Sequence, residues 1–296
     1  MKQIIQYMPC RLRQLCAPWC HSEVQEIRVH KGGSFAVVSE GNAVVPKKNY
    51  VVTEREFNQL LESLCGNSLY TYEDEIRKGY FTLREGHRVG VAGHVLMEQG
   101  RVKTIRNITS LNIRISHEKK GCGNPVIEHL INGATFLSTL IVSPPGCGKT
   151  TLLRDLVRIL AGKTYRNSIA LIDERSEIAG CYRGVPRNDV GENCFVMDGC
   201  EKSVGIEMMI RSMSPNIVAV DEIGIKKDAE ALQKALCQGV KILATAHGSS
   251  YEDVCHLPDL WSLIGKDKIS RIVFLNAYGG PGEIREIVDE RGSRLV

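Results

Sequence analysis

The residues best suited to chemistry form one short stretch, residues 143–151, in which two glycines precede a lysine and two threonines. Backbone N–H groups in such a loop, with the N-terminus of a following helix, form a concave site for an anion. Glycine lets the backbone approach a phosphate closely, and in this pattern the lysine reaches the β- and γ-phosphates while the next hydroxyl binds Mg²⁺. We predict that nucleotide is bound by Ser143, Pro144, Pro145, Gly146, Cys147, Gly148, Lys149, Thr150 and Thr151, with Thr150 on the metal.

This loop has the neighbours that a P-loop requires. Residues 139–142 are apolar and predict a strand, and residues 151–160 carry apolar side chains at helical spacing. Strand, glycine loop and helix in that order distinguish a P-loop from a chance glycine turn. Ser143 departs from the usual pattern, which begins with glycine. A serine fits there only if the backbone φ suits a residue with a Cβ.

Two acidic residues follow a second apolar run, residues 215–222. A buried strand there would deliver Asp221 and Glu222 to the carboxyl edge of a parallel sheet, where ligands bind in open α/β folds. We expect Asp221 to hold Mg²⁺, directly or through water, and Glu222 to act as the general base on an attacking water. The order of P-loop and acidic strand end therefore favours hydrolysis over binding alone.

Further candidates end the two neighbouring predicted strands. Thr245 and His247 end the strand over residues 240–247, at the place of a group that contacts the γ-phosphate or the water. Glu174 and Glu177 follow the strand over residues 168–173 and are candidates for sharing the activation of water. The alternatives are a structural histidine and an ion-paired loop.

The C-terminal half alternates strands and helices, which predicts an α/β fold with a mostly parallel sheet covered on both faces. Helices are expected over residues 126–132, 204–212 and 228–238, and further strands over residues 271–275 and 283–288. We place a domain boundary in the charged, glycine-containing stretch 119–125. The predicted domains are residues 1–124, a small α+β domain, and residues 125–296, a P-loop ATPase domain.

The N-terminal domain is predicted as a meander with helices. Strands are expected over residues 26–30, 35–38, 80–83, 87–95, 101–106 and 111–115, and helices over residues 53–64 and 71–78. Thr53 and Glu56 have the spacing of a capping box. Arg88, Arg106 and Arg114 lie on the meander, where a solvated sheet face is the simplest explanation for them.

Composition excludes several classes of protein. The chain of 296 residues is 43% hydrophobic and 24% charged, as expected of a globular protein with a large core. No run approaches the ~20 apolar residues of a membrane-spanning helix, and the start of the chain lacks the pattern of a signal peptide. Its eleven cysteines include no closely spaced pair typical of metal sites, which favours a reducing cytoplasm.

Taken together, these stretches resemble the stage III sporulation protein AA family over nearly the whole chain. The matching stretches are the P-loop with Leu152-Leu153-Arg154-Asp155, Asp173-Glu174-Arg175-Ser176-Glu177, Gly184-Val185-Pro186, Asp189-Val190-Gly191, Arg211-Ser212-Met213-Ser214-Pro215, Asp221-Glu222-Ile223-Gly224, Ala244-Thr245-Ala246-His247-Gly248, Ser68-Leu69-Tyr70, Gly86-His87-Arg88-Val89-Gly90 and Ile113-Arg114-Ile115. The departures are Ser143 and Gly32-Gly33 with His30, in a strand that normally contains arginine.

That family is similar to the traffic ATPases of type II and type IV secretion and of pilus assembly. The resemblance implies a RecA-like core, a Mg²⁺-dependent ATPase, a hexameric ring and a role at the channel between mother cell and forespore. It also implies a position in the mother-cell cytoplasm at the membrane, with membrane proteins of the channel as partners. In the secretion ATPases, arginines of the equivalent meander reach a neighbour's nucleotide, and Arg88, Arg106 and Arg114 match by position.

Two other functions remain open from the sequence. A P-loop ATPase associated with nucleic acid is disfavoured because aromatic residues do not alternate with the basic ones on the meander. A regulatory subunit that binds ATP with little turnover is disfavoured by the intact Glu222, whereas Ser143 leaves it open.

Overall fold

The chain forms two compact units in the computed structural model, which describes residues 2–19, 24–39, 42–66, 68–224, 226–257, 268–276 and 280–296. The first unit comprises Met1–His117 together with Gly180–Arg187. The second comprises Glu118–Ala179 and Asn188–Val296. The chain therefore passes between the units three times, because a segment inside the predicted ATPase domain belongs to the first unit.

The second unit is built on a seven-stranded sheet in the order β11-β10-β12-β13-β9-β14-β15. Every strand pair in it is parallel except the last, β14 with β15. The strands of this unit, including a separate hairpin of β7 and β8, are β7 (Ile131–Asn132), β8 (Thr135–Phe136), β9 (Thr139–Val142), β10 (Ile169–Asp173), β11 (Cys194–Asp198), β12 (Ile217–Val220), β13 (Lys241–Ala246), β14 (Arg271–Leu275) and β15 (Ile284–Asp289). Its helices are α5 (Asn124–Ile127), η3 (Glu128–Leu130), α6 (Lys149–Leu160), α7 (Lys202–Met213), α8 (Lys226–Cys237) and α9 (Tyr251–Cys255).

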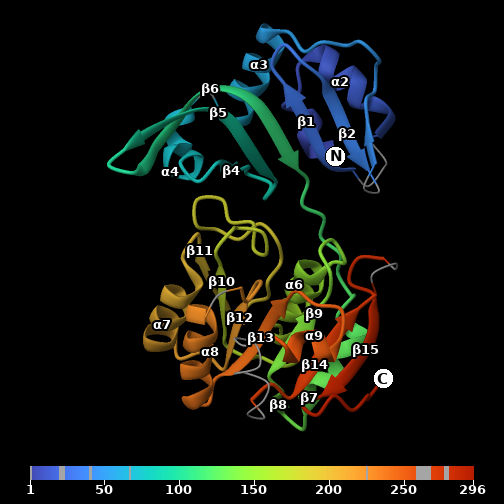
Figure 1. The fold of residues 1–296 in the computed structure, drawn as a ribbon, viewed down its shortest axis with the longest axis vertical. Helices are drawn as coiled ribbons and strands as arrows, with labels where there is room; N and C mark the ends of the chain where they lie inside the picture. The colour runs from blue at the N-terminus through green and yellow to red at the C-terminus, as the bar shows by residue number, and fades with distance from the viewer. Residues whose placement is uncertain are drawn as a thin grey trace. The chain divides into compact units, whose positions relative to one another are not determined.

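The mostly parallel sheet is confirmed. The central strands β9, β10 and β12 are buried at every residue, as strands covered on both faces must be. Figure 1 shows α7 and α8 side by side against the β10–β12–β13 part of the sheet. No helix among the described residues is long and apolar enough to cross a membrane.

Two predictions for this unit need correction, and one strand was missed. The strand expected over residues 215–222 is the shorter β12, so Asp221 and Glu222 follow the strand and do not end it. The helix expected over residues 126–132 stops at Leu130, because Ile131 has an extended backbone and begins the β7–β8 hairpin, which turns at Gly133 with a φ of 60°. Strand β11 was also missed; its apolar run is only four residues long, and it is a half-exposed strand at the edge of the sheet.

The first unit has a six-stranded sheet in the order β3-β2-β1-β6-β5-β4, with every pair antiparallel. Its strands are β1 (Val24–His30), β2 (Phe35–Ser39), β3 (Asn42–Val44), β4 (Tyr80–Thr82), β5 (Arg88–Glu98) and β6 (Arg101–Arg114). Its helices are α1 (Lys2–Ile5), α2 (Cys10–Cys16), η1 (Ala17–Trp19), α3 (Glu54–Leu64), η2 (Leu69–Tyr72) and α4 (Glu73–Ile76). The small α+β domain is thus confirmed, but the two strands expected over residues 101–106 and 111–115 are one strand, β6.

Local signals account for α3. The Thr53 hydroxyl accepts the N–H of Glu56, and the Glu56 carboxylate accepts the N–H of Thr53 at 2.9 Å, which is the predicted capping box. The helix then buries Phe57, Leu60 and Leu64 against the sheet core. The helix expected over residues 71–78 is instead the short pair η2 and α4.

Segment 180–187 contributes to the core of the first unit. Tyr182 packs against its hydrophobic cluster and hydrogen-bonds the buried phenol of Tyr72. The Cβ of Arg187 lies so close to Gly86 that a side chain there would approach it to 3.1 Å. Segment 180–187 is therefore a structural part of the first unit and not a free loop of the second.

His87 ties three parts of the first unit together. Its Nδ1 accepts the N–H of Ser116, after β6, so Nε2 carries the proton and donates to Gln3 of α1 at 3.1 Å. The ring is 3% exposed, and burial lowers the pKa of His87 to about 4. The folded first unit therefore requires the neutral imidazole.

We predict that this histidine makes stability fall in mildly acidic solution. Because the folded pKa lies below the unfolded value of about 6.5, the unfolded chain takes up the proton first as pH falls. The free energy of unfolding should drop between pH 6.5 and pH 4, by up to roughly 3 kcal/mol from this group. Urea unfolding of His87→Asn should show a flatter pH dependence by that amount, whereas His94→Asn, at an exposed position, should retain the wild-type slope. Equal slopes for all three proteins would contradict the assignment.

Candidate functional site

The P-loop joins β9 to α6. Gly146 and Gly148 have φ values of 81° and 90°, in the left-handed region that favours glycine. Gly148 is also closely covered, because the N–H of Gly282 donates to the Cys147 carbonyl at 2.9 Å. The first N–H groups of α6 have no acceptor within the helix, which is the property that the predicted anion site uses.

Ser143 fits its position without strain. It is not among the described residues with positive φ, so the backbone accepts a Cβ there. Its side chain is buried, and its hydroxyl donates to the Pro144 carbonyl at 2.8 Å. The serine thus replaces the usual glycine through a local hydrogen bond.

Lys149, the first residue of α6, is 8% exposed and has three acceptors. Its Nζ donates to the Ser143 carbonyl at 2.9 Å, the Pro144 carbonyl at 3.1 Å and Nδ1 of His247 at 3.1 Å. Burial lowers the pKa of Lys149, while the nearby carboxylates of Glu222 and Asp221 act in the opposite direction. The ammonium group is therefore held by the loop itself and by a histidine of the next strand end.

His247 connects the lysine to Glu222. Since Nδ1 accepts from an ammonium group, the ring is neutral and carries its proton on Nε2. Nε2 lies 3.1 Å from Oε1 of Glu222 and donates to it. Three of the predicted catalytic residues thus form one chain, from lysine through imidazole to carboxylate.

Thr245 organises the adjacent acidic pair. Its buried hydroxyl donates to Oδ1 of Asp221 at 3.1 Å and accepts the N–H of Glu222 at 3.0 Å. The same Asp221 oxygen also accepts the Glu222 N–H at 3.0 Å. Asp221 and Glu222 are consequently fixed at the carboxyl edge of the sheet, directly after β12.

Glu174 lies at the same edge but is engaged elsewhere. It pairs with Nζ of Lys202 at 2.5 Å, and the Lys202 side chain is 9% exposed. Glu174 and Lys202 share a cavity of about 230 Å³ with Asp221 and Glu222. The structure therefore places Glu174 near the acidic pair while neutralising it with a lysine that sequence reasoning did not select.

Asp173, just before Glu174, shapes this loop. Its carboxylate accepts the N–H groups of Glu177, Ile178 and Ala179 at 2.8–3.0 Å and is fully buried. Burial raises the pKa of Asp173 to about 6, against the three hydrogen bonds, which lower it. The residue thus organises the loop, a role that its position at a strand end did not reveal.

The predicted metal ligands suit Mg²⁺. Among the described residues, no group of three or more His, Cys, Asp or Glu side chains could hold a metal ion by itself. Mg²⁺ in nucleotide sites takes one or two protein ligands and completes its shell with phosphates and water. Thr150, at the start of α6, and Asp221 supply hydroxyl and carboxylate oxygens of the kind that this ion prefers.

The candidate arginines belong to the first unit. The guanidinium carbon of Arg88 lies 3.7 Å from the centre of the Tyr80 ring, and Arg114 pairs with Glu26 at 3.2 Å. Arg88 and Arg114 are also cross-strand neighbours on β5 and β6, whereas Arg106 is exposed opposite His94. Their contribution to a nucleotide site stays a prediction.

Comparison with known proteins shows the family of this chain. The family described as "Sporulation stage III, protein AA" matches residues 1–295. The "Stage III sporulation protein AA" of Bacillus subtilis (strain 168) is 42% identical over 276 residues, which cover 92% of this chain and 89% of that protein.

Solved structures show the same fold at low sequence identity. The ATPase DotB of Yersinia pseudotuberculosis has a TM-score of 0.61 at 13% identity, covering 96% of this chain and 80% of DotB. The pilus retraction motor PilT, solved with ADP, has a TM-score of 0.60 at 15% identity, covering 88% and 76%. The predicted RecA-like core preceded by a small α+β domain is confirmed.

The two P-loop glycines form a matched pair for testing whether the turn at Pro281–Gly282 packs against the P-loop. In Gly146→Ala the new Cβ meets nothing within 4 Å and brings only backbone strain, about 1–2 kcal/mol. In Gly148→Ala it would lie 2.7 Å from the Pro281 carbonyl carbon, so the turn at Pro281–Gly282 must move. Urea unfolding should show Gly148→Ala less stable than Gly146→Ala by about 1–3 kcal/mol. Equal losses in the free energy of unfolding would mean that the turn does not pack against the P-loop.

Proposed function

We propose that this chain, which belongs to the stage III sporulation protein AA family, is a Mg²⁺-dependent ATPase that works as a ring oligomer. The energy of hydrolysis would drive a specialised secretion or channel apparatus between mother cell and forespore. The observation that carries the proposal is the chain from Lys149 through His247 to Glu222 at the P-loop.

Phosphate binding begins with an exchange of partners at Lys149. The lysine now donates to two loop carbonyls and to His247, and none of the three carries a formal charge. A phosphate oxygen is a stronger acceptor for an ammonium group because the hydrogen bond is charge-assisted. The N–H groups of the loop and the start of α6 hold the remaining phosphate oxygens.

Hydrolysis then depends on Glu222 and His247. A water held by Glu222 attacks the γ-phosphorus, its proton passes to the carboxylate, and the bond to the bridging oxygen breaks to give ADP and phosphate. His247 orients the carboxylate through Nε2, and its Nδ1 becomes available when Lys149 turns to the phosphate. Bound Mg²⁺, held by Thr150 and Asp221, would neutralise charge on the phosphate oxygens.

Two further parts of the proposal concern assembly and place. Arg88 and Arg106 would contact the nucleotide of a neighbouring copy, which makes turnover depend on ring formation. The secretion-ATPase fold and the sporulation family support a position at the mother-cell membrane, on the cytoplasmic side, with membrane proteins of the channel as partners.

Substitutions at the P-loop should separate binding from hydrolysis. Lys149→Ala removes the charge that holds the phosphates and should abolish detectable ATP binding. Glu222→Gln keeps the size of the side chain but removes the carboxylate base. ATP binding should therefore persist, while turnover falls by about 10²-fold or more. Glu252→Gln, on an exposed turn of α9, makes the same chemical change elsewhere and should hydrolyse ATP like the wild type. Wild-type turnover in Glu222→Gln would place the base elsewhere, with Glu174 and Glu177 the next candidates.

The arginine prediction is tested by turnover in the assembled protein. Arg88→Ala should leave ATP binding intact and lower oligomer-dependent turnover by about 10³-fold, because a guanidinium no longer stabilises charge in the transition state. Arg101→Ala removes an exposed arginine from the same hairpin and is the control. Unchanged turnover in an assembled Arg88→Ala ring would exclude this role.

A further inference from the structure

The helix that begins at the P-loop also anchors the chain wherever it passes between the two units. These passages lie at residues 117/118, 179/180 and 187/188. Next to each passage lie residues of the second unit that are hydrogen-bonded either to α6 or to the residues beside another passage. The contacts come from Arg154, Asp155 and Arg158, all on α6, and from Asp189.

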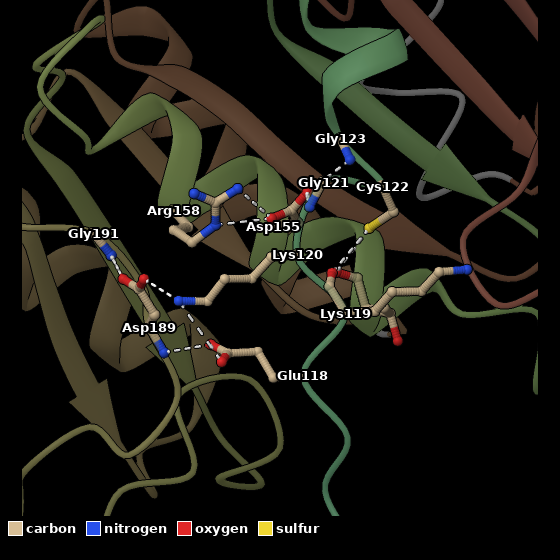
Figure 2. A network of polar contacts seen from close by, with 11 residues as sticks. Glu118, Lys119, Lys120, Gly121, Cys122, Gly123, Asp155, Arg158, Asp189 and Gly191 are labelled. Atoms are coloured by element: carbon tan, nitrogen blue, oxygen red, sulfur yellow. Dashed lines mark hydrogen bonds and ion pairs between the residues drawn. The ribbon is translucent and has the colours of Figure 1, made fainter. Parts of the chain in front are cut away.

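Asp155 holds the first passage, the linker at residues 118–123, as Figure 2 shows. Its Oδ2 accepts the N–H groups of Gly121 and Gly123, each at 2.8 Å. Its Oδ1 accepts Nε and Nη2 of Arg158 at 2.8 and 2.7 Å. The carboxylate is 2% exposed, and these four N–H groups are all donors. A neutral amide at this position could not satisfy them, since its nitrogen would face N–H groups.

The linker fits α6 closely around this carboxylate. A Cβ on Gly123 would lie 3.0 Å from a methyl of Ile159 and 3.1 Å from a methyl of Leu156, so a larger residue there would push these side chains aside by a few tenths of an ångström. The Cys122 thiol contacts the carbonyl of Thr151, two residues after the P-loop lysine and in the first turn of α6. The linker therefore lies along α6 from its first turn to its last.

The third passage is tied to the first. Oε1 of Glu118 accepts the N–H of Asp189 at 2.9 Å, and Nζ of Lys120 donates to Oδ2 of Asp189 at 2.6 Å. Figure 2 shows these side chains converging beside Arg158. The residues that follow the first and third passages are thus one hydrogen-bonded group.

The second passage is held by Arg154. Its Nε donates to the Ile178 carbonyl and its Nη2 to the Glu177 carbonyl, both at 2.6 Å. The N–H of Asn188 donates to the Ala179 carbonyl at 3.0 Å, which joins the second passage to the third. Segment 180–187, between Ala179 and Asn188, is packed in the core of the first unit. Because this segment is not a free loop, it cannot take up a displacement of Ala179 or Asn188.

We propose that α6 transmits the state of the P-loop to all three passages, and that Asp155 is the positioning residue that couples the linker to the helix. The inference rests on the proposed function, because the signal is nucleotide at the N-terminus of α6. Phosphate fixes the first turn of α6, and a helix is stiff enough to pass that constraint to Arg154, Asp155 and Arg158. Nucleotide binding therefore stabilises the hydrogen bonds from Gly121 and Gly123 to Asp155.

Amide hydrogen exchange at Gly121 and Gly123 tests the coupling directly. In the nucleotide-free protein, Asp155→Asn should exchange both amides about tenfold faster or more, since a charged acceptor is lost. In the wild type, AMP-PNP with Mg²⁺ should slow their exchange, by up to about 100-fold at 100 times its Kd. In Asp155→Asn, AMP-PNP should protect the P-loop amides without slowing the linker. Glu230→Gln, on the exposed face of α8, is the matched control and should behave as the wild type.

The outcomes separate the two proposals. Protection of the P-loop amides without protection of Gly121 and Gly123 in the wild type contradicts the coupling alone. No protection of the P-loop amides at any concentration contradicts the proposed function, and the coupling falls with it. If Asp155→Asn does not fold, Lys120→Gln serves in its place, because it loosens the Asp189 tie and should weaken the response of Gly121 to nucleotide.

Discussion

A buried ammonium group beside the P-loop is the constraint on which the site depends. Lys149 is almost fully enclosed, and a charge in such a place is tolerated only with acceptors around it. In the structure the acceptors are two loop carbonyls and His247. The hydrogen bond from Lys149 fixes the tautomer of His247. The Nε2–H of His247 therefore points at Glu222, the candidate base, and donates a hydrogen bond to it. In the proposed function phosphate would replace those acceptors, so a single exchange at Lys149 would both bind the nucleotide and change the surroundings of the proposed base.

The same helix serves a second purpose along its length. Its N-terminus offers N–H groups to an anion, and its body presents Arg154, Asp155 and Arg158 to the chain segments that lead to the first unit. The buried core of the second unit, with strands covered on both faces, holds α6 against β9 and β13. A helix so placed is suited to connect a chemical event at one end with a mechanical one along its side.

Sequence reasoning found the elements that have strong local signals. Near-continuous apolar runs gave β9, β10 and β12, and the Thr53–Glu56 capping box gave α3. The meeting of Lys149, Asp221, Glu222 and His247 at one edge was also predicted, since strand ends of a parallel sheet lie together there. Their chemical roles stay predictions. Contacts between distant segments were not predictable: the pairing of Glu174 with Lys202, the place of segment 180–187 and the role of Asp155 each depend on tertiary structure. Ser143, unexplained in the sequence, is accounted for by its negative φ and its hydrogen bond to Pro144.

The most direct test is ATP turnover per chain of the wild-type protein with Mg²⁺, measured across protein concentration while its size in solution is followed. A ring ATPase completed by neighbouring copies should show turnover per chain that rises with concentration, in step with formation of the oligomer. Nucleotide binding without hydrolysis above background at any concentration, in a protein of proven assembly, would contradict the assignment of Glu222 and His247 to catalysis.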